Sequence, residues 1–326
     1  MARSVAADKR GRMVSGRSMR GARAGSPKMW LSGLTSAMRA RANGLELEYD
    51  TFGSPRNAPL VLIMGFAQQL IGWDEAFCEQ LARRDFFVVR FDNRDIGLST
   101  KLEGAPLPDI VAILGGDMST RAYSIEDMAD DTAGLLDALG FVTAHIVGAS
   151  MGGMIAQTLS LRDPRRVLTL TSIMSSTGDP SVGHSTPEAR AMLFERPPAA
   201  RDAYIEYGVR LRNTLKSPGF PFVEARARER SARAYDRCFY PPGGARQFAA
   251  IVSQPDRTKE LQQLRVPTLV VHGTDDPLIN ISGGEATARA IPEARFLTVP
   301  GMGHELPEGA WTLVVDAIAD NTARIR

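Results

Sequence analysis

The chain has 326 residues, of which 44% are hydrophobic and 23% charged, values typical of a globular protein that buries a sizeable core. Its net charge of +2 is uneven: residues 1–41 hold ten Lys or Arg and one acid, so the remainder carries −7. A mildly acidic body argues against nucleic-acid binding, and no apolar run approaches the ~20 residues of a membrane span.

The first 40 residues are rich in Arg, Ser and Gly, poor in acids, and lack the continuous apolar segment of a secretory signal. This composition is typical of a disordered tail, which we expect over residues 1–40. It also fits a transit peptide, an upstream start codon or a vector-derived leader. The two cysteines, Cys78 and Cys238, are few for so long a chain, which favours a reducing compartment and predicts a cytoplasmic location.

Alternating strand and helix patterns begin near residue 45. Short apolar or alternating runs predict strands, and amphipathic stretches between them predict helices. The predicted strands are Leu45–Tyr49, Pro59–Met64, Phe86–Phe91, Ala144–Val147 and Val167–Ile173, and the predicted helices are Asp74–Arg84, Ser124–Leu139 and Met151–Leu161.

Residues 178–262 interrupt this rhythm with Arg-rich, Pro-punctuated helical patterns such as Ala200–Leu215 and Phe222–Ala234. The alternation then resumes with the predicted strands Val266–His272 and Arg295–Val299 and the helices Ala286–Ala290 and Gly309–Asn321. Strands alternating with helices predict an α/β fold with a mostly parallel sheet covered on both faces. We expect a core formed by residues 41–177 and 263–326, with residues 178–262 inserted as helices over one edge.

The stretch "VGASMGGM", residues 147–154, places Ser150 between glycines, after a predicted strand and before a predicted helix. This is the context of a G-x-S-x-G nucleophile elbow, in which a tight turn exposes a serine hydroxyl at the carboxyl end of a strand. The simpler interpretation is a Gly/Ser turn that caps a helix. Because strand and helix flank it as required, the sequence favours Ser150 as a nucleophile.

A serine nucleophile needs a base, and the base needs an acid that orients it. Of the four histidines, His304 alone sits in a loop directly after the last predicted strand, so we assign it as the base. Asp275 and Asp276 both follow a predicted strand, and spacing does not separate them. The order Ser, Asp, His along the chain is the one expected of this architecture.

An oxyanion hole needs two backbone amides near the serine. The amide of Met151 lies at the start of the predicted helix, and the loop Gly65–Gln68 follows a buried strand, so its first free amides are placed to supply the second. A plain turn is the alternative interpretation of this loop.

The motifs "LVLIMGFAQQLIGWD", "VVRFDNRDIGLST", "GASMGGMIAQ", "SIMSSTGDP", "VVHGTDDPLI" and "PGMGHELP" together resemble the α/β-hydrolase superfamily, and more closely serine esterases of the aclacinomycin methylesterase-like group. The resemblance runs from about Leu45 to the C-terminus. It implies Ser150 as nucleophile, His304 as base and Asp276 as acid, with oxyanion amides from Phe66 and Met151. It also implies that residues 178–262 form a helical cap. We expect the reaction to use no cofactor or metal.

Two further features are assigned on weaker grounds. Trp73 and Met154 are candidate pocket residues, although side chains of these types in such places are more often part of the core. The segment Asp92–Gly97 contains two acids and an arginine that could contact substrate, but a turn held by an Arg–carboxylate pair is the favoured interpretation.

The resulting hypothesis is a serine carboxylesterase that acts on a small-molecule ester. The alternatives are perhydrolase or haloperoxidase-like chemistry, carbon–carbon bond hydrolysis, and a hydrolase-fold ligand receptor with little turnover. Methyl esters of polyketides are implied by the resemblance, and simple short-chain alkyl or aryl esters are an equal alternative. The sequence leaves the oligomeric state open.

Overall fold

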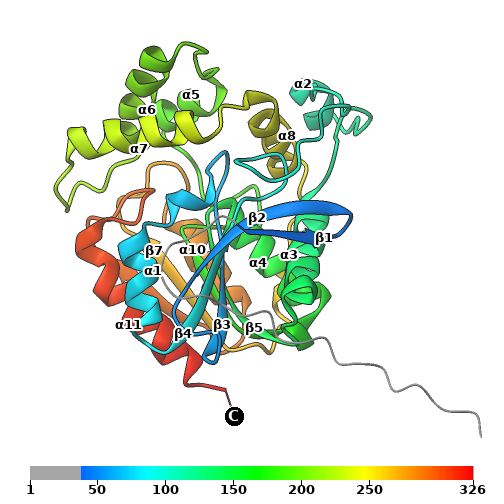
Figure 1. The fold of residues 1–326 in the computed structure, drawn as a ribbon, viewed down its shortest axis with the longest axis vertical. Coiled ribbons are helices and arrows are strands. Elements are labelled where there is room, and N and C mark those ends of the chain that lie inside the picture. The colour runs from blue at the N-terminus through cyan, green and yellow to red at the C-terminus, as the bar shows by residue number, and fades with distance from the viewer. Residues whose placement is uncertain (1–37, 326) are drawn as a thin grey trace, which may run out of the picture. The chain divides into compact units, whose positions relative to one another are not determined.

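A computed structural model describes residues 38–325, so residues 1–37 of the predicted tail lie outside the described residues. Strand β1 begins at Met38, within the range expected to be tail. The strands form one eight-stranded sheet in the order β1-β2-β4-β3-β5-β6-β7-β8 (Figure 1). They are β1 (Met38–Ala42), β2 (Leu45–Phe52), β3 (Ala58–Ile63), β4 (Phe86–Phe91), β5 (Ala144–Ala149), β6 (Val167–Ile173), β7 (Thr268–Gly273) and β8 (Arg295–Val299).

The middle of the sheet is built from strands that are apolar along most of their length. In β3 and β5 nearly every side chain is buried, because helices cover both faces of a parallel sheet. The two strands are neighbours and parallel, with Ile63 opposite Gly148 near their carboxyl ends. The β1–β2 and β2–β4 pairs are antiparallel, and the other pairs are parallel.

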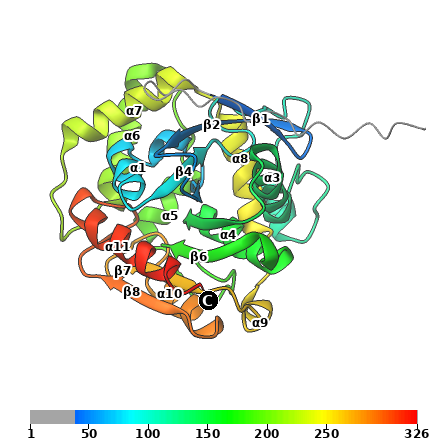
Figure 2. The same ribbon diagram turned by 60° about the horizontal axis from the view of Figure 1, so that its bottom comes forward.

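Helices cover the sheet in two layers, each packed over its own hydrophobic cluster. Helices α1 (Glu75–Ala82) and α11 (Trp311–Thr322) pack on one face, and α3 (Ile125–Leu139), α4 (Met151–Arg162) and α10 (Ser282–Ala290) on the other (Figures 1 and 2). Helix α3 is well delimited in sequence: Ser124 and Asp127 form a capping box, and Gly140 ends the helix in the left-handed conformation. The α/β fold class is confirmed.

The inserted segment, residues 178–262, contains five helices between β6 and β7. They are α5 (Pro187–Phe194), α6 (Arg201–Leu215), α7 (Glu224–Arg237), α8 (Pro241–Val252) and α9 (Thr258–Leu261). The segment leaves and rejoins the core at neighbouring points: the Arg257 amide donates to Thr177 O at 3.0 Å, and the hydroxyls of Thr177 and Thr258 are also 3.0 Å apart. A short helix α2 (Ile110–Leu114) lies in the long connection after β4 and contacts α8.

Within residues 38–325, every helix is too short or too polar to span a lipid bilayer.

Candidate active site

Ser150 lies at a sharp turn between β5 and α4, with φ 55° and ψ −120°, a conformation that a residue with a side chain rarely adopts. The turn is tight enough that a Cβ on Gly148 would lie 2.0 Å from Gly152 O, and one on Gly152 would lie 2.1 Å from Ile63 O. The backbone therefore requires glycine on both sides of the serine, which answers why so many glycines follow a buried strand.

The hydroxyl of Ser150 meets the ring of His304. Ser150 Oγ lies 3.0 Å from His304 Nε2, and His304 Nδ1 lies 2.8 Å from Asp276 Oδ2. The three side chains come from the ends of β5, β7 and β8, and parallel strands bring these ends to one edge of the sheet. The structure thus brings together all three side chains that the resemblance implied.

Asp276 is buried and shares its carboxylate among several donors. Its Oδ1 accepts from the amides of Leu278 and Ile279, both at 2.9 Å, and its Oδ2 also lies 3.4 Å from His272 Nε2. Burial raises the pKa of Asp276, but the His304 charge and the hydrogen bonds from His272 and His304 outweigh burial and bring this pKa below its usual value. The group therefore stays an ionised acceptor.

None of the remaining candidates for acid and base in residues 38–325 lies between Ser150 and Asp276. Asp275 accepts from the hydroxyl of its neighbour Thr274, not from a histidine. His145 is buried against Thr169, with 2.9 Å between Nδ1 and the hydroxyl, and His184 is exposed. His272 is buried and its Nε2 lies 2.7 Å from Ile279 O, so it supports the turn that carries Asp276.

Two backbone amides near Ser150, those of Met151 and Phe66, have no hydrogen-bond acceptor within the described part of the chain. The Met151 amide is at the first position of α4, where helix amides lack an intrahelical partner and the dipole favours negative charge. In the β3 loop (residues 65–70), Ala67 N–H donates to Gln247 Oε1 and Gln68 N–H to Gly65 O. Among residues 38–325, no acceptor is paired with the amide of Phe66.

The two candidate pocket residues are both buried. Trp73 stacks on Phe77, with 5.7 Å between ring centroids, inside the cluster between the sheet and helices α1 and α11. Met154 belongs to the cluster on the other face, and its sulfur accepts from Gln254 Nε2 at 3.2 Å. These are the contacts of core side chains, and a role in binding substrate stays a prediction.

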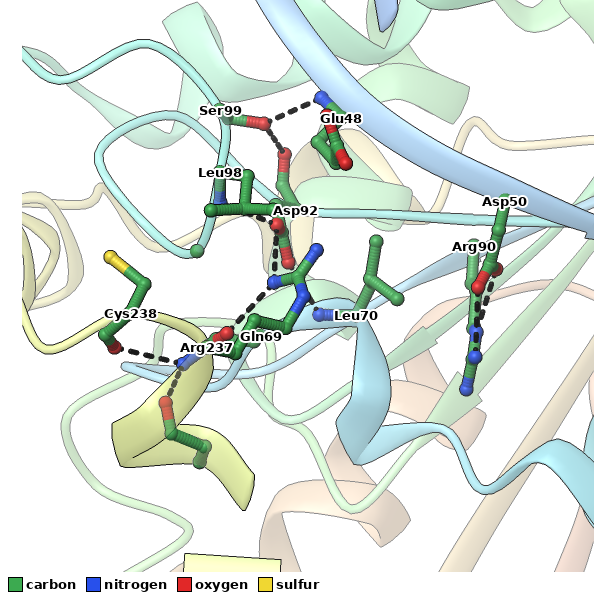
Figure 3. Close-up of polar contacts among 12 residues, drawn as sticks. Glu48, Asp50, Gln69, Leu70, Arg90, Asp92, Leu98, Ser99, Arg237 and Cys238 are labelled. Atoms are coloured by element: carbon green, nitrogen blue, oxygen red, sulfur yellow. Dashed lines mark hydrogen bonds and ion pairs between the residues drawn. The ribbon is translucent and has the colours of Figure 1, made fainter. Parts of the chain in front are cut away.

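The β4 loop (residues 92–97) is held by Arg–carboxylate pairs, but each partner comes from another element. Arg237 of α7 donates to Asp92 at 2.7 Å, and Arg246 of α8 donates to Asp95 at 2.8 Å. Figure 3 shows Arg237 reaching Asp92 from α7. Arg94 instead pairs with Asp131 of α3. The loop is therefore one of the places where the inserted helices are fastened to the core.

Sequence reasoning missed the residues that hold His304 in place. The His304 amide donates to Leu215 O at 2.9 Å, and the Gly303 amide to the hydroxyl of Ser217 at 2.9 Å. Glu305 in turn accepts from the Ser217 amide at 3.0 Å. These contacts come from the end of α6, and no local motif links residues so distant in sequence.

A cavity of about 380 Å³ lies beside the acid, lined by Thr186, Asn213, Thr214, Lys216, Pro218, Asp275, Asp276 and Pro277. A second cavity, of about 170 Å³, is lined largely by charged residues, among them Glu75, Arg90 and Arg233. In the described part of the chain, no three His, Cys, Asp or Glu side chains are arranged to hold a metal ion.

A family model described as alpha/beta hydrolase fold matches residues 58–309. The chain is 30% identical over 293 residues to rhodomycin D methylesterase DauP of Streptomyces sp. (strain C5). The matched region covers 83% of this chain and 92% of the relative. The chain is 28% identical to rhodomycin D methylesterase DnrP of Streptomyces peucetius, with the same two coverages.

Among solved structures, a meta-cleavage product hydrolase from Pseudomonas fluorescens IP01 superposes with a TM-score of 0.70 at 19% identity, covering 89% of this chain and 98% of the other. At that identity the likeness shows a shared fold.

Proposed function

The chain belongs to the alpha/beta hydrolase fold family, and from this premise we propose that it hydrolyses carboxylic esters through an acyl-enzyme intermediate on Ser150. The observation that carries the proposal is the continuous chain of hydrogen bonds from Ser150 through the His304 ring to Asp276. The two methylesterase relatives support ester hydrolysis rather than another reaction of the family.

In the first half of the reaction, Ser150 Oγ attacks the ester carbonyl carbon while His304 Nε2 takes the hydroxyl proton. Asp276 accepts from Nδ1–H, which keeps the ring in the required tautomer and stabilises the imidazolium as it forms. The tetrahedral oxygen becomes negative, and the free amides of Phe66 and Met151 donate to it. His304 then protonates the leaving alcohol, and the acyl group stays on Ser150.

In the second half, water enters and His304 removes its proton as it attacks the acyl-enzyme carbonyl. The same amides hold the second tetrahedral oxygen. Collapse of this intermediate returns the proton from His304 to Ser150 and releases the carboxylic acid. Every proton moves between substrate, water, Ser150 and His304, so the cycle is complete without a further co-reactant.

We propose that the substrate is a small-molecule ester with a small alcohol, because both methylesterase relatives carry that activity in their names. The inserted segment, residues 178–262, would act as a cap over the site, since Leu215 and Ser217 contact the loop that carries His304. A cytoplasmic location remains a prediction from the cysteine content.

Replacing Ser150 with alanine tests the proposal. We expect Ser150→Ala to lower turnover of a p-nitrophenyl ester by at least about 10³-fold, because the nucleophile is lost while fold and binding remain. Thermal unfolding should match the wild type, and Ser54→Ala, at an exposed serine, serves as the matched control. Unchanged turnover in Ser150→Ala would refute the proposal.

A panel of methyl, ethyl and aryl esters identifies the preferred alcohol. Carbon–carbon bond hydrolysis is the alternative that the meta-cleavage product hydrolase fold suggests, although that likeness shows the fold alone. Turnover of a vinylogous diketone with no turnover of any ester would favour that alternative. Tight ester binding with negligible kcat would instead indicate a receptor.

A further inference from the structure

The β3 loop (residues 65–70), which carries the Phe66 amide, forms several hydrogen bonds with the inserted helices. Gln247 of α8 has no exposed surface, and its Oε1 accepts from Ala67 N–H at 2.9 Å. Its Nε2 points to Arg94 O, 3.3 Å away, in the β4 loop. One buried amide therefore connects the β3 loop, the β4 loop and helix α8.

Ala67 is the residue in the loop that most needs such a partner. Its φ of 54° lies in the left-handed region, which is unfavourable for a residue with a side chain. A strained conformation persists only where the surroundings over-determine it. Because Phe66 directly precedes Ala67, the hydrogen bond to Gln247 also fixes the peptide next to the free amide.

The far end of the loop is fastened to α7. Gln69 Nε2 donates to the carbonyl oxygens of Ala234 and Cys238, at 2.7 and 3.0 Å, where α7 ends. Gln69 Oε1 accepts from Arg237 at 2.7 Å, and the same Arg237 atom donates to Asp92 (Figure 3).

The core adds one more contact to this cluster. Leu70 N–H donates to the buried carboxylate of Asp92 at 2.7 Å, and this carboxylate is the one that Arg237 pairs with. A movement of α7 would therefore displace two consecutive residues of the loop, Gln69 directly and Leu70 through Asp92.

Helix α8 is held against the β4 loop by two contacts with Asp95. Arg246, next to Gln247, forms a buried pair with Asp95, with distances of 2.8 and 3.2 Å. Gly243 approaches the same loop so closely that a Cβ there would lie 2.0 Å from Asp95 O. Gln247 thus reaches Ala67 from a fixed position.

We propose that Gln247, assisted by Gln69 and Arg237, is a positioning residue for the oxyanion amide of Phe66, so that the inserted segment forms part of the catalytic machinery. This inference rests on the proposed esterase function. An oxyanion donor works only within about 2.7–3.1 Å of the developing charge, so a loop displaced by a fraction of an ångström loses transition-state stabilisation while substrate binding is little changed.

The test is Gln247→Met, which keeps the side-chain volume but cannot accept from Ala67. Active sites are counted with a phosphonate, so that kcat refers to folded, reactive enzyme only. We expect kcat per active site to fall by about 10- to 100-fold, KM to stay within about twofold, and the inhibition constant of a boronic acid, whose adduct mimics the tetrahedral state, to rise in parallel.

Gln263→Met is the matched control, because Gln263 is an exposed glutamine directly after the inserted segment, and it should match the wild type. If Gln247→Met does not fold, Gln69→Met removes the α7 contacts from the other end of the loop and should shift kcat and boronate binding in the same direction.

If both glutamine variants show fewer active sites that react with the phosphonate but an unchanged kcat per active site, Gln247 and Gln69 have a purely structural role and the inference is overturned. That result leaves the proposed function intact as long as Ser150→Ala is inactive. Retained turnover in Ser150→Ala would overturn the function itself, whatever the glutamine variants do.

Discussion

At the scale of single residues, the hydrogen bonds of the site converge on Asp276. Its Oδ1 accepts hydrogen bonds from two backbone amides, and its Oδ2 lies 2.8 Å from His304 Nδ1 and 3.4 Å from His272 Nε2. The turn after β7 thus turns one of two adjacent aspartates inward. Sequence spacing could not show whether Asp275 or Asp276 pairs with the histidine. The conformation of the turn decides this, because the amides of Leu278 and Ile279 bind the carboxylate of Asp276.

His145 illustrates how a buried ionisable residue affects stability. Its ring lies in the core against Phe86 and Thr169, and burial lowers the pKa of His145 to about 4. The unfolded chain binds this proton near the ordinary pKa of about 6.5. Between these values the unfolded state holds more protons, so the free energy of unfolding falls as the pH falls from about 6.5 to about 4.

We therefore predict that His145 accounts for up to about 3 kcal/mol of stability that is present above pH ~6.5 and lost toward pH ~4. Urea unfolding of His145→Gln across this range should show a shallower pH dependence than the wild type. His184→Gln, at an exposed histidine, is the matched control. Equal slopes for His145→Gln and the wild type would contradict the prediction.

At the scale of secondary-structure elements, helix α7 is fastened to the core by charge. Arg226, Arg230, Arg233 and Arg237 are spaced to lie along one face of the helix, and they pair with Asp74, Glu75 and Asp92. From the sequence alone, these arginines would be expected to face solvent. These three carboxylates are more than 140 residues away from their arginines, so periodicity alone predicts the helix but not the surface that it contacts.

The turn between β5 and α4 gives a prediction about glycine. Gly148→Ala would place a Cβ 2.0 Å from Gly152 O, a backbone atom that cannot move without unwinding the start of α4. We expect it to cost at least about 3 kcal/mol of unfolding free energy, measured by urea unfolding.

Gly104→Ala is the control for that substitution, because nothing lies within 4 Å of the position that its new methyl group would take and its φ is not positive. It should change stability by less than about 0.5 kcal/mol. A Gly148→Ala protein as stable as Gly104→Ala would show that the turn is less tight than the structure indicates.

Most of the core elements were predictable from sequence, because apolar runs such as Phe86–Phe91 and capped helices such as Ile125–Leu139 carry strong local signals. Helix α8 was not predicted. It opens with Pro-Pro-Gly-Gly, residues 241–244, which reads as a loop, although proline is compatible with the first turn of a helix. Strand β1 was missed because it is short and basic, and its pairing with β2 decides its conformation.

At the scale of the whole molecule, residues 38–325 combine two hydrophobic clusters, one on each face of the sheet, with a site built from loops at a single edge. The fold class, Ser150 and His304 could be anticipated because motifs mark the strand ends, whereas Asp276 was singled out from Asp275 only by the family resemblance. The supports from Ser217 and Gln247 could not, since they depend on how the inserted helices settle on those loops.

The two thiols differ in exposure, so their reaction rates measure different opening motions of the protein. Cys78 has no exposed surface and burial raises its pKa, whereas Cys238 is partly exposed at the end of α7. We predict that one thiol per chain reacts with Ellman's reagent in native buffer and that the second reacts at the rate of global unfolding. In denaturant both should react together.

Cys238→Ser should then remove the fast phase and leave the slow one. Equal rates for the two thiols in native buffer would contradict this assignment and indicate that helix α1 opens independently of the rest of the core.

The close approach of Thr177 to Arg257 and Thr258 makes the inserted helices an exchangeable module. A foreign insert whose ends meet at the same spacing could be grafted there without disturbing strand order. Such a chimaera would acquire a new binding preference together with a defect in rate, unless the graft also supplied an acceptor for Ala67. To change the substrate specificity of this fold, a graft must therefore also supply the group that positions the oxyanion amide.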